Sequence, residues 1–210
     1  MRKLYLDLPK NACNTGFVKI GSSRELASLK SVLKDPSSSG PDPVYWVFND
    51  VGNEKWANLT IITPGSFNGE YPKTFGHYHP TGVPDETYHL IGGEGILVMQ
   101  KKHFENGSWI PEMVDEVYLI KTKPGEEIVI TPEFGHSWSN TGVEPLISYD
   151  NWRSGHQPSD YEPIEKLQGM AYYLVEKNGE VEAVPNPNYR DLPKPKWVTA
   201  KELSGRDGAF

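Results

Sequence analysis

Four side chains in this 210-residue chain have the types and the spacing of a divalent metal site. Side chains in a strand alternate between its two faces, so His77 and His79 lie on the same face if their segment is extended. Glu86 follows after a turn, and His136 comes from a third segment, so neighbouring strands could complete the set. Any one of these histidines alone would more often be an ordinary surface or core residue. The agreement of all four in spacing and strand parity favours a metal site.

The ligand types narrow the choice of ion. Three imidazoles and one carboxylate are ligands of intermediate softness, and they leave two positions of an octahedron open for substrate or water. Fe²⁺, Mn²⁺, Ni²⁺ and Zn²⁺ are therefore candidates, whereas Ca²⁺ and Mg²⁺ prefer a shell of oxygen atoms. Cys13 is the single cysteine of the chain, which excludes a thiolate-rich zinc site and an internal disulfide framework.

The elements that must position these ligands are expected to be strands. Twenty glycines and eighteen prolines divide the chain into short segments, many of them rich in β-branched and aromatic residues. The predicted strands are Val44–Phe48, Asn58–Ile62, Thr87–Ile91, Gly95–Met99, Glu116–Ile120, Glu127–Ile130, Leu146–Tyr149 and Ala171–Val175. This pattern predicts an all-β sandwich or small barrel.

Two helices are predicted outside these strands. Ser22 and Glu25 have the spacing of a capping box, and the apolar residues that would share one face of the helix are Leu26, Leu29, Val32 and Leu33. A second, shorter helix is expected after Thr199, with Glu202 three residues on. The proline-rich stretch Pro185–Trp197 is predicted to cross a surface as an extended arm rather than as a sheet strand.

These elements predict three parts of the chain. They are a helical N-terminal arm over residues 1–43, a barrel over residues 44–184 and an extended C-terminal arm over residues 185–210. The formal net charge of −7 disfavours nucleic acid and anionic lipid as partners. The N-terminal residues lack the apolar run of a signal peptide, and no run approaches the length of a membrane span, so a cytoplasmic protein is expected.

The histidine-containing segments resemble the two motifs of the cupin superfamily. The first is Thr-x-Gly-His-x-His over residues 74–79 with Glu-x-Tyr over residues 86–88, and the second is Gly-His at residues 135–136 followed by Asn140. Six residues separate His79 from Glu86, a wider gap than in most cupins. That gap and the flanking residues are similar to the cupin-type glucose-6-phosphate isomerases best known from archaea. The resemblance implies a cupin double-stranded β-helix, also called a jelly-roll barrel.

The resemblance also implies roles for individual residues. His77, His79, Glu86 and His136 would be the metal ligands, with Fe²⁺ or Mn²⁺ favoured and Ni²⁺ or Zn²⁺ as alternatives. The resemblance implies that Tyr88 lies in the sugar pocket and that Thr60, Thr74 and the Gly76 backbone contact the phosphate. Tyr149 would contact the phosphate or the sugar ring. Alignment of Gly155 and His156 with the family leaves Tyr149 one place out of register, which would turn it to the opposite face. Arg153 could then serve as a planar phosphate donor.

The reaction implied is the interconversion of glucose 6-phosphate and fructose 6-phosphate. Glu86 would remove a proton from the substrate, while Tyr88 and His156 would move protons among its oxygens. A metal-assisted hydride shift, with Glu86 only a ligand, is the alternative route. Mannose 6-phosphate or another sugar phosphate is an alternative substrate. The alternative functions are a non-haem iron oxygenase with the same ligands and a cupin that binds a sugar or metabolite without turnover.

A homodimer is the expected assembly of this barrel. The aromatic residues Tyr45, Trp46 and Phe48 could supply its interface, although each of them taken singly is more often a residue of the barrel core.

Overall fold

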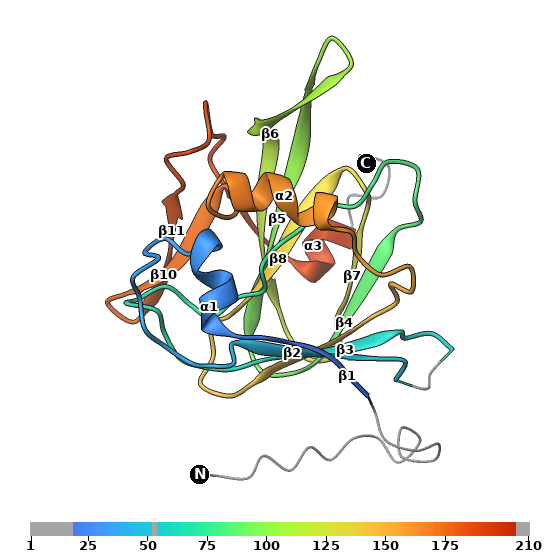
Figure 1. Cartoon of the computed structure of the whole chain (residues 1–210), viewed down its shortest axis with the longest axis vertical. Helices are drawn as coiled ribbons and strands as arrows, with labels where there is room; N and C mark the ends of the chain where they lie inside the picture. The colour runs from blue at the N-terminus through green and yellow to red at the C-terminus, as the bar shows by residue number, and fades with distance from the viewer. Residues whose placement is uncertain (1–18, 52–53, 205–210) are drawn as a thin grey trace.

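Short strands separated by turns make up most of the molecule, which a computed structural model describes over residues 19–51 and 54–204 (Figure 1). The first sheet contains, in spatial order, β1 (Lys19–Arg24), β2 (Tyr45–Asn49), β3 (Asn58–Ile62), β9 (Leu146–Asp150), β4 (Glu86–Gly92) and β7 (Glu127–Ile130). The second sheet contains β12 (Lys196–Thr199), β6 (Ser108–Thr122), β5 (Gly95–Glu105) and β8 (Phe134–Asn140). A separate hairpin is formed by β10 (Tyr172–Lys177) and β11 (Glu180–Pro185).

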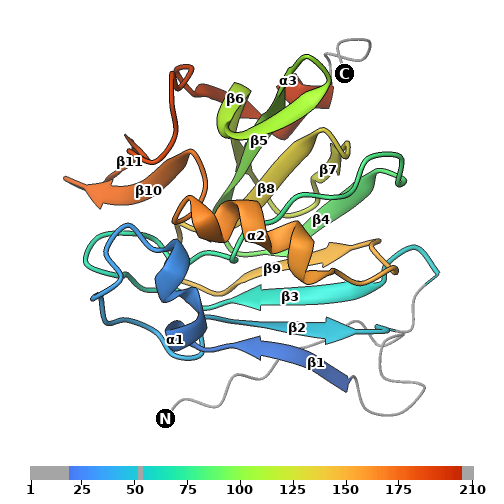
Figure 2. The ribbon, with the colours of Figure 1, turned by 45° about the horizontal axis from the view of Figure 1, so that its top comes forward.

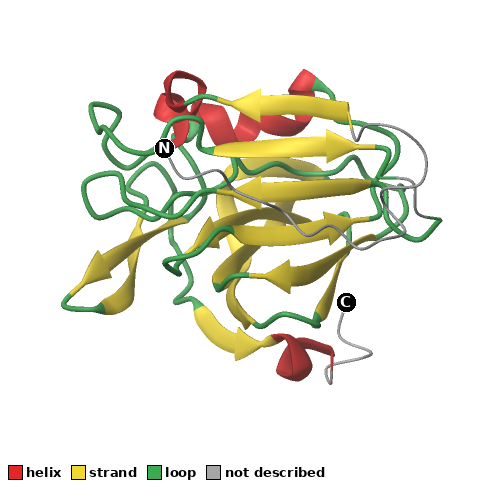
Figure 3. Ribbon diagram, turned by 90° about the horizontal axis from the view of Figure 1, so that it is seen from below, coloured by secondary structure: helices red, strands yellow, loops and turns green. Residues whose placement is uncertain are grey.

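The helices are few and short (Figure 3). They are α1 (Leu26–Leu29), which continues into the 3₁₀ turn η1 (Lys30–Val32), then α2 (Pro158–Lys166) and α3 (Ala200–Ser204). In Figure 2, α2 lies in front of the strands, and only Asp160 and Ile164 of this helix are buried. Among the described residues, no helix has the length and apolar character that a membrane span needs.

An extended segment over residues 72–79 completes the second sheet. The Asn140 N–H donates to the Pro72 carbonyl at 2.8 Å, and the Thr74 N–H donates to the Trp138 carbonyl at 2.9 Å. His77 and His136 exchange both of their backbone hydrogen bonds, at 3.1 and 2.9 Å. β7 and β9 belong to the first sheet and β8 belongs to the second. The chain therefore crosses to the second sheet after β7 and returns to the first sheet before β9. Two sheets joined in this way form a jelly roll, so the predicted all-β fold is confirmed.

The apolar core lies between the two sheets. Trp138 and Phe134 of β8 and Leu97 of β5 are each at most 1% exposed within it. A second, smaller apolar cluster lies on the opposite face of the first sheet, and its members are Val51, Trp56, Leu59, Ile61 and Tyr149. The first sheet therefore packs apolar residues on both of its faces, the core on the inner face and this cluster on the outer face.

The prediction of the first helix is wrong in its start and its length. Ser22 lies in β1, where it pairs with Val47 of β2, and the helical turn begins only at Leu26. The Leu26 N–H is capped at 2.9 Å by the carboxylate of Asp42, sixteen residues away, rather than by Ser22. Strand pairing and a distant cap override the local pattern here, although Leu29 is buried as predicted.

All eight predicted strands correspond to observed ones, and the structure adds strands that the sequence analysis did not predict. The largest correction concerns the Pro185–Trp197 stretch, because Lys196 and Trp197 begin β12, which pairs in parallel with β6. The helix predicted after Thr199 is confirmed as α3, and the Glu202 N–H donates to the Thr199 hydroxyl at 3.2 Å. The three-part division of the chain stays a prediction, although β1 and β12 each add a strand to a sheet. Cys13 lies outside the described residues.

Candidate metal centre and active site

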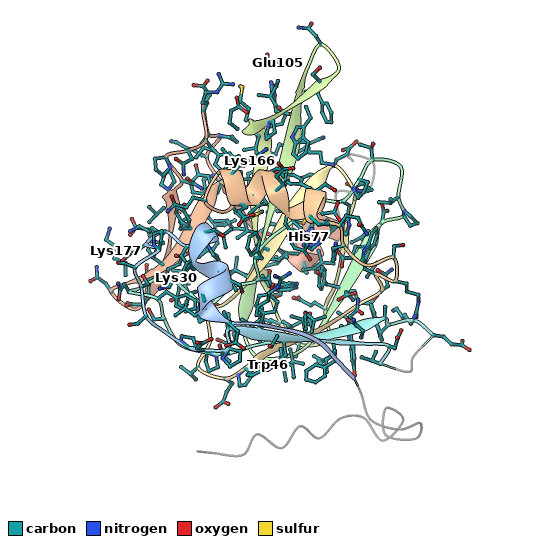
Figure 4. All side chains as sticks on the ribbon, viewed as in Figure 1. Lys30, Trp46, His77, Glu105, Lys166 and Lys177 are labelled. Atoms are coloured by element: carbon teal, nitrogen blue, oxygen red, sulfur yellow. The ribbon has the colours of Figure 1, made fainter. Side chains whose placement is uncertain are left out.

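The four predicted ligands come together in one buried cluster. The candidate ligand atoms of His77, His79, Glu86 and His136 all lie within 4.8 Å of one another. Glu86 Oε2 is 2.8 Å from His79 Nε2, 3.0 Å from His136 Nε2 and 4.0 Å from His77 Nε2. Figure 4 places His77 in the interior of the molecule, between the sheets and below one end of α2.

The cluster fits a divalent ion. Metal–ligand bonds of about 2.0–2.2 Å would separate pairs of ligand atoms by roughly 3.0–4.4 Å, close to the spread observed here. His77 Nε2 is buried and has no hydrogen-bond partner within the part of the chain that the structure describes. A buried polar atom without a partner is costly, and coordination would satisfy it. The donor set is nitrogen and carboxylate oxygen, which suits a transition metal.

Electrostatics favour the forms of His77 and Glu86 that can bind a metal, a neutral imidazole and an ionised carboxylate. Burial, followed by the charges of His136 and His156, holds the pKa of His77 well below its usual value, so this imidazole is neutral. Burial alone would raise the pKa of the Glu86 carboxyl, but the charge of His136 and hydrogen bonds from His136 and His79 outweigh it. The pKa of Glu86 is therefore well below its usual value, and the group is ionised.

Backbone pairing fixes the direction of the ligand side chains. The two hydrogen bonds between His77 and His136 hold their segments in register, so both imidazoles face the interior. The buried Lys102 ammonium donates to the His79 carbonyl at 2.8 Å and to the Pro132 carbonyl at 2.8 Å. These two bonds link the segment that carries His79 to the segment that leads to His136.

The cluster borders a cavity of about 430 Å³ on the inner face of the first sheet. This volume lies within the range of small-molecule sites. His77, Tyr88 and His156 line it on the side of the metal ligands, and Thr60, Thr74 and Gly76 also contribute to its wall. The cavity therefore joins the candidate metal ligands to most of the residues that the sequence analysis assigned to substrate.

Comparison with known proteins decides the family. The model of the family described as "Glucose-6-phosphate isomerase (GPI)" matches residues 30–191. The chain belongs to the glucose-6-phosphate isomerase family. The enzyme of that name from Thermococcus onnurineus (strain NA1) is 31% identical over 178 residues, which cover 80% of this chain and 86% of that protein. The one from Pyrococcus abyssi (strain GE5 / Orsay) is 31% identical over 191 residues, covering 84% and 93%.

Likeness to solved structures is partial. An oxalate oxidase in complex with the substrate analogue glycolate matches with a TM-score of 0.34 and 16% identity, over 51% of this chain and 40% of that one. The jelly-roll assignment therefore depends on the strand pairing described above and not on this likeness.

Most of the residues that resemblance to this isomerase family assigns to substrate face the cavity. Thr60 of β3 is 6% exposed in its wall. The Thr74 hydroxyl accepts a hydrogen bond from the Trp138 N–H at 3.0 Å, which fixes it in place. Gly76 has a φ of +84°, and an added Cβ would lie 3.1 Å from Met170 Sδ and 3.3 Å from Ser137 Cβ. Gly76 is thus suited to bring its backbone close to a bound group.

Tyr149 is the exception, because it lies on the outer face of the first sheet. It stacks on Trp56 with ring centroids 6.2 Å apart in the outer apolar cluster, and it does not line the cavity. Its neighbour Asp150 points inward instead, as the one-residue shift requires. Arg153 does line the cavity, where it is exposed and donates to the Glu54 carbonyl at 2.8 Å.

Asp150 is a cavity residue that the sequence analysis missed. One of its oxygens accepts hydrogen bonds from Asn58 at 2.7 Å and from the Trp152 N–H at 3.0 Å. Burial, with a smaller contribution from the charge of Glu86, raises the pKa of Asp150 to about 7 despite these bonds. The parity argument that excludes Tyr149 could have identified Asp150, because adjacent strand residues face opposite ways.

The raised pKa of Asp150 predicts a pH-dependent loss of stability. A carboxyl with a higher pKa in the folded chain binds its proton more tightly there, so stability falls as the pH rises from about 4 to 7. At about 1.4 kcal/mol per pKa unit, the loss from pH 5 to pH 8 is of the order of 2–3 kcal/mol. Asp150→Asn should remove this part of the pH dependence, measured by urea unfolding at both pH values. Asp85→Asn, at an exposed carboxyl, is the control, and an unchanged slope in Asp150→Asn would contradict the prediction.

Proposed function

We propose that this chain interconverts glucose 6-phosphate and fructose 6-phosphate with a divalent metal held by His77, His79, Glu86 and His136. Membership of the glucose-6-phosphate isomerase family supports the reaction. The observation that carries the proposal is the convergence of these four ligand atoms in one buried cluster, of which His77 lines the cavity. A metal-dependent aldose–ketose isomerase needs such a site beside a cavity that holds the open-chain sugar.

The bound ion would supply Lewis-acid polarisation of the substrate carbonyl and stabilise charge on the two oxygens that exchange a proton. Glu86 is ionised, so it has the form that can accept the substrate proton, and two imidazoles hold it in place. The Tyr88 hydroxyl lies 3.5 Å from His136 Nε2. Burial raises the pKa of Tyr88 well above its usual value, so it remains a proton donor.

His156 is the second candidate for proton movement. Its ring lies 4.0 Å from the ring of His77, and its Nδ1 has no hydrogen-bond partner among residues 19–51 and 54–204. Burial lowers the pKa of His156 to about 4, so the imidazole is neutral near pH 7 and can accept a proton from a sugar hydroxyl. A neutral imidazole at the wall of the cavity could assist ring opening.

Three finer points belong to the same proposal. Fe²⁺ or Mn²⁺ is the proposed ion, with Ni²⁺ and Zn²⁺ as alternatives, because the nitrogen and carboxylate donors suit all four.

A homodimer is proposed through the outer face of the first sheet, where Trp46 and Phe48 are only half-buried. Tyr45 lies on the inner side and lines the cavity, so it does not belong to that face. A cytoplasmic location is proposed on the basis of the sequence.

Turnover of fructose 6-phosphate by metal-stripped protein, and again after addition of each of the four ions, tests the proposal. We expect metal-dependent formation of glucose 6-phosphate, with mannose 6-phosphate measured in the same assay. Oxygen uptake without isomerisation would favour the oxygenase alternative, and metal binding without either would favour a binding protein. In the reverse direction, deuterium at C2 of glucose 6-phosphate would be retained at C1 of fructose 6-phosphate after a hydride shift and would exchange with water if Glu86 removes it as a proton.

A further inference from the structure

A cationic side chain lines the cavity on β1, outside the proposed metal ligands and outside the residues assigned to substrate so far. Arg24 is the last residue of β1, and it pairs across the sheet with Tyr45 of β2. Both residues line the same cavity as His77 and Tyr88. Arg24 is half-buried, so its guanidinium is partly removed from water.

Two aromatic rings hold the Arg24 guanidinium in place. Its Cζ atom lies 5.5 Å from the centroid of the Tyr161 ring and 5.9 Å from that of the Phe75 ring. These rings meet edge to face with centroids 5.6 Å apart. A guanidinium stacked on rings keeps the N–H groups at its edge available for planar recognition of an anion.

Arg24 forms no ion pair within the described part of the chain. Among residues 19–51 and 54–204, no carboxylate lies within ion-pair distance of Arg24, although Asp50 and Asp150 line the same cavity. The hydroxyls of Tyr45 and Tyr161 are its polar neighbours. A half-buried cation whose neighbours are neutral creates a local positive potential, which favours an anionic ligand in a chain of net charge −7.

Tyr161 connects this cation to the metal ligands. Its ring centroid lies 5.6 Å from that of His77 and 5.6 Å from that of His156, while the Arg24 guanidinium lies over the same ring. The cation and the metal ligands are thus both neighbours of one aromatic side chain. In a hexose 6-phosphate, the reacting carbons C1 and C2 lie at one end of the carbon chain and the phosphate lies at the other end. One substrate molecule can therefore contact both the metal ligands and the Arg24 guanidinium.

We propose that Arg24 binds the phosphate group of the substrate and sets the preference of this cavity for a sugar phosphate over a neutral sugar. The proposal rests on the proposed function. Charge-assisted bonds from the guanidinium would add to the hydroxyls of Thr60 and Thr74 and the backbone at Gly76. Because the phosphate does not change in the reaction, this interaction contributes equally to substrate and transition state.

Kinetics of Arg24→Met on metal-loaded protein test the proposal. The methionine keeps an unbranched side chain over the two rings and removes the charge. We expect the KM for fructose 6-phosphate to rise by about ten- to thirtyfold with kcat nearly unchanged, because loss of uniform binding affects KM alone. Arg24→Lys should give a smaller rise. Arg190→Met, at an exposed arginine paired with Glu112, should leave both constants unchanged.

Direct binding of inorganic phosphate separates this proposal from the proposed function. Calorimetry on the metal-loaded chain should show that Arg24→Met weakens phosphate binding by a similar factor while metal affinity stays the same. Weakened phosphate binding in a chain without isomerase activity would support the anion site and contradict the function. Equal phosphate binding and equal KM in folded Arg24→Met would overturn the role of Arg24 and leave the function standing. If Arg24→Met does not fold, Arg24→Gln gives the same comparison.

Discussion

Replacement of His136 with alanine is expected to lower metal affinity and isomerase turnover by at least about 10³-fold. Loss of a residue that only orients a metal ligand already costs about 10–100-fold, and His136 is proposed as a ligand itself. His136 is 1% exposed, and its Nε2 lies 3.0 Å from Glu86 Oε2, so its loss also leaves a buried carboxylate with one partner fewer. Metal content by mass spectrometry and kcat on reconstituted protein measure the two effects. Glu86→Ala should behave in the same way.

The fold is expected to survive this change, because the backbone bonds between His136 and His77 do not depend on the imidazole. His103→Ala is the matched control: His103 lies away from the cavity and contacts Asp115 at 2.6 Å. That variant should keep its metal and its activity. Full metal content and normal turnover in both His136→Ala and Glu86→Ala, with circular dichroism unchanged, would show that the proposed centre is wrong.

Strand alternation explains why the cluster of candidate metal ligands could be predicted from the sequence. In an extended segment the direction of a side chain depends only on whether its position is odd or even, so His77 and His79 must share a face. Glu86 and Tyr88 follow the same rule on β4. The turn-rich composition predicted an all-β fold, although β8, which carries His136, was not among the predicted strands.

Features set by distant parts of the chain could not be predicted in this way. Ser22 and Glu25 satisfy a local helix rule, yet β1 gains more from pairing with β2, and Asp42 caps the helical turn from sixteen residues away. The same helix prediction gave no sign that Arg24 lines the cavity, because the side chain reaches the cavity from a strand, β1. Pairing partners and the packing of α2 over the cavity are tertiary properties, which a local pattern does not contain.

Tyr88→Phe is expected to lower kcat by about 10²-fold, whereas Tyr149→Phe should change it by less than about twofold. Tyr88 lines the cavity, and its hydroxyl lies 3.5 Å from His136 Nε2, so its removal takes away a proton donor beside the reacting oxygens. Tyr149 packs in the outer apolar cluster, and loss of its hydroxyl does not reach the cavity. Steady-state kinetics on reconstituted protein, with metal content matched, measure both.

The two tyrosines make a controlled pair because they lie on adjacent strands in adjacent register. Tyr88 is directly opposite Asp150, and Tyr149 is directly opposite His89, so each pair faces its own side of the same sheet. A general effect of losing a tyrosine hydroxyl from this sheet would lower kcat in both variants alike, and that result would contradict the assignment. Loss confined to Tyr88→Phe would show that one step along β9 separates a residue of the active site from a residue of the outer face.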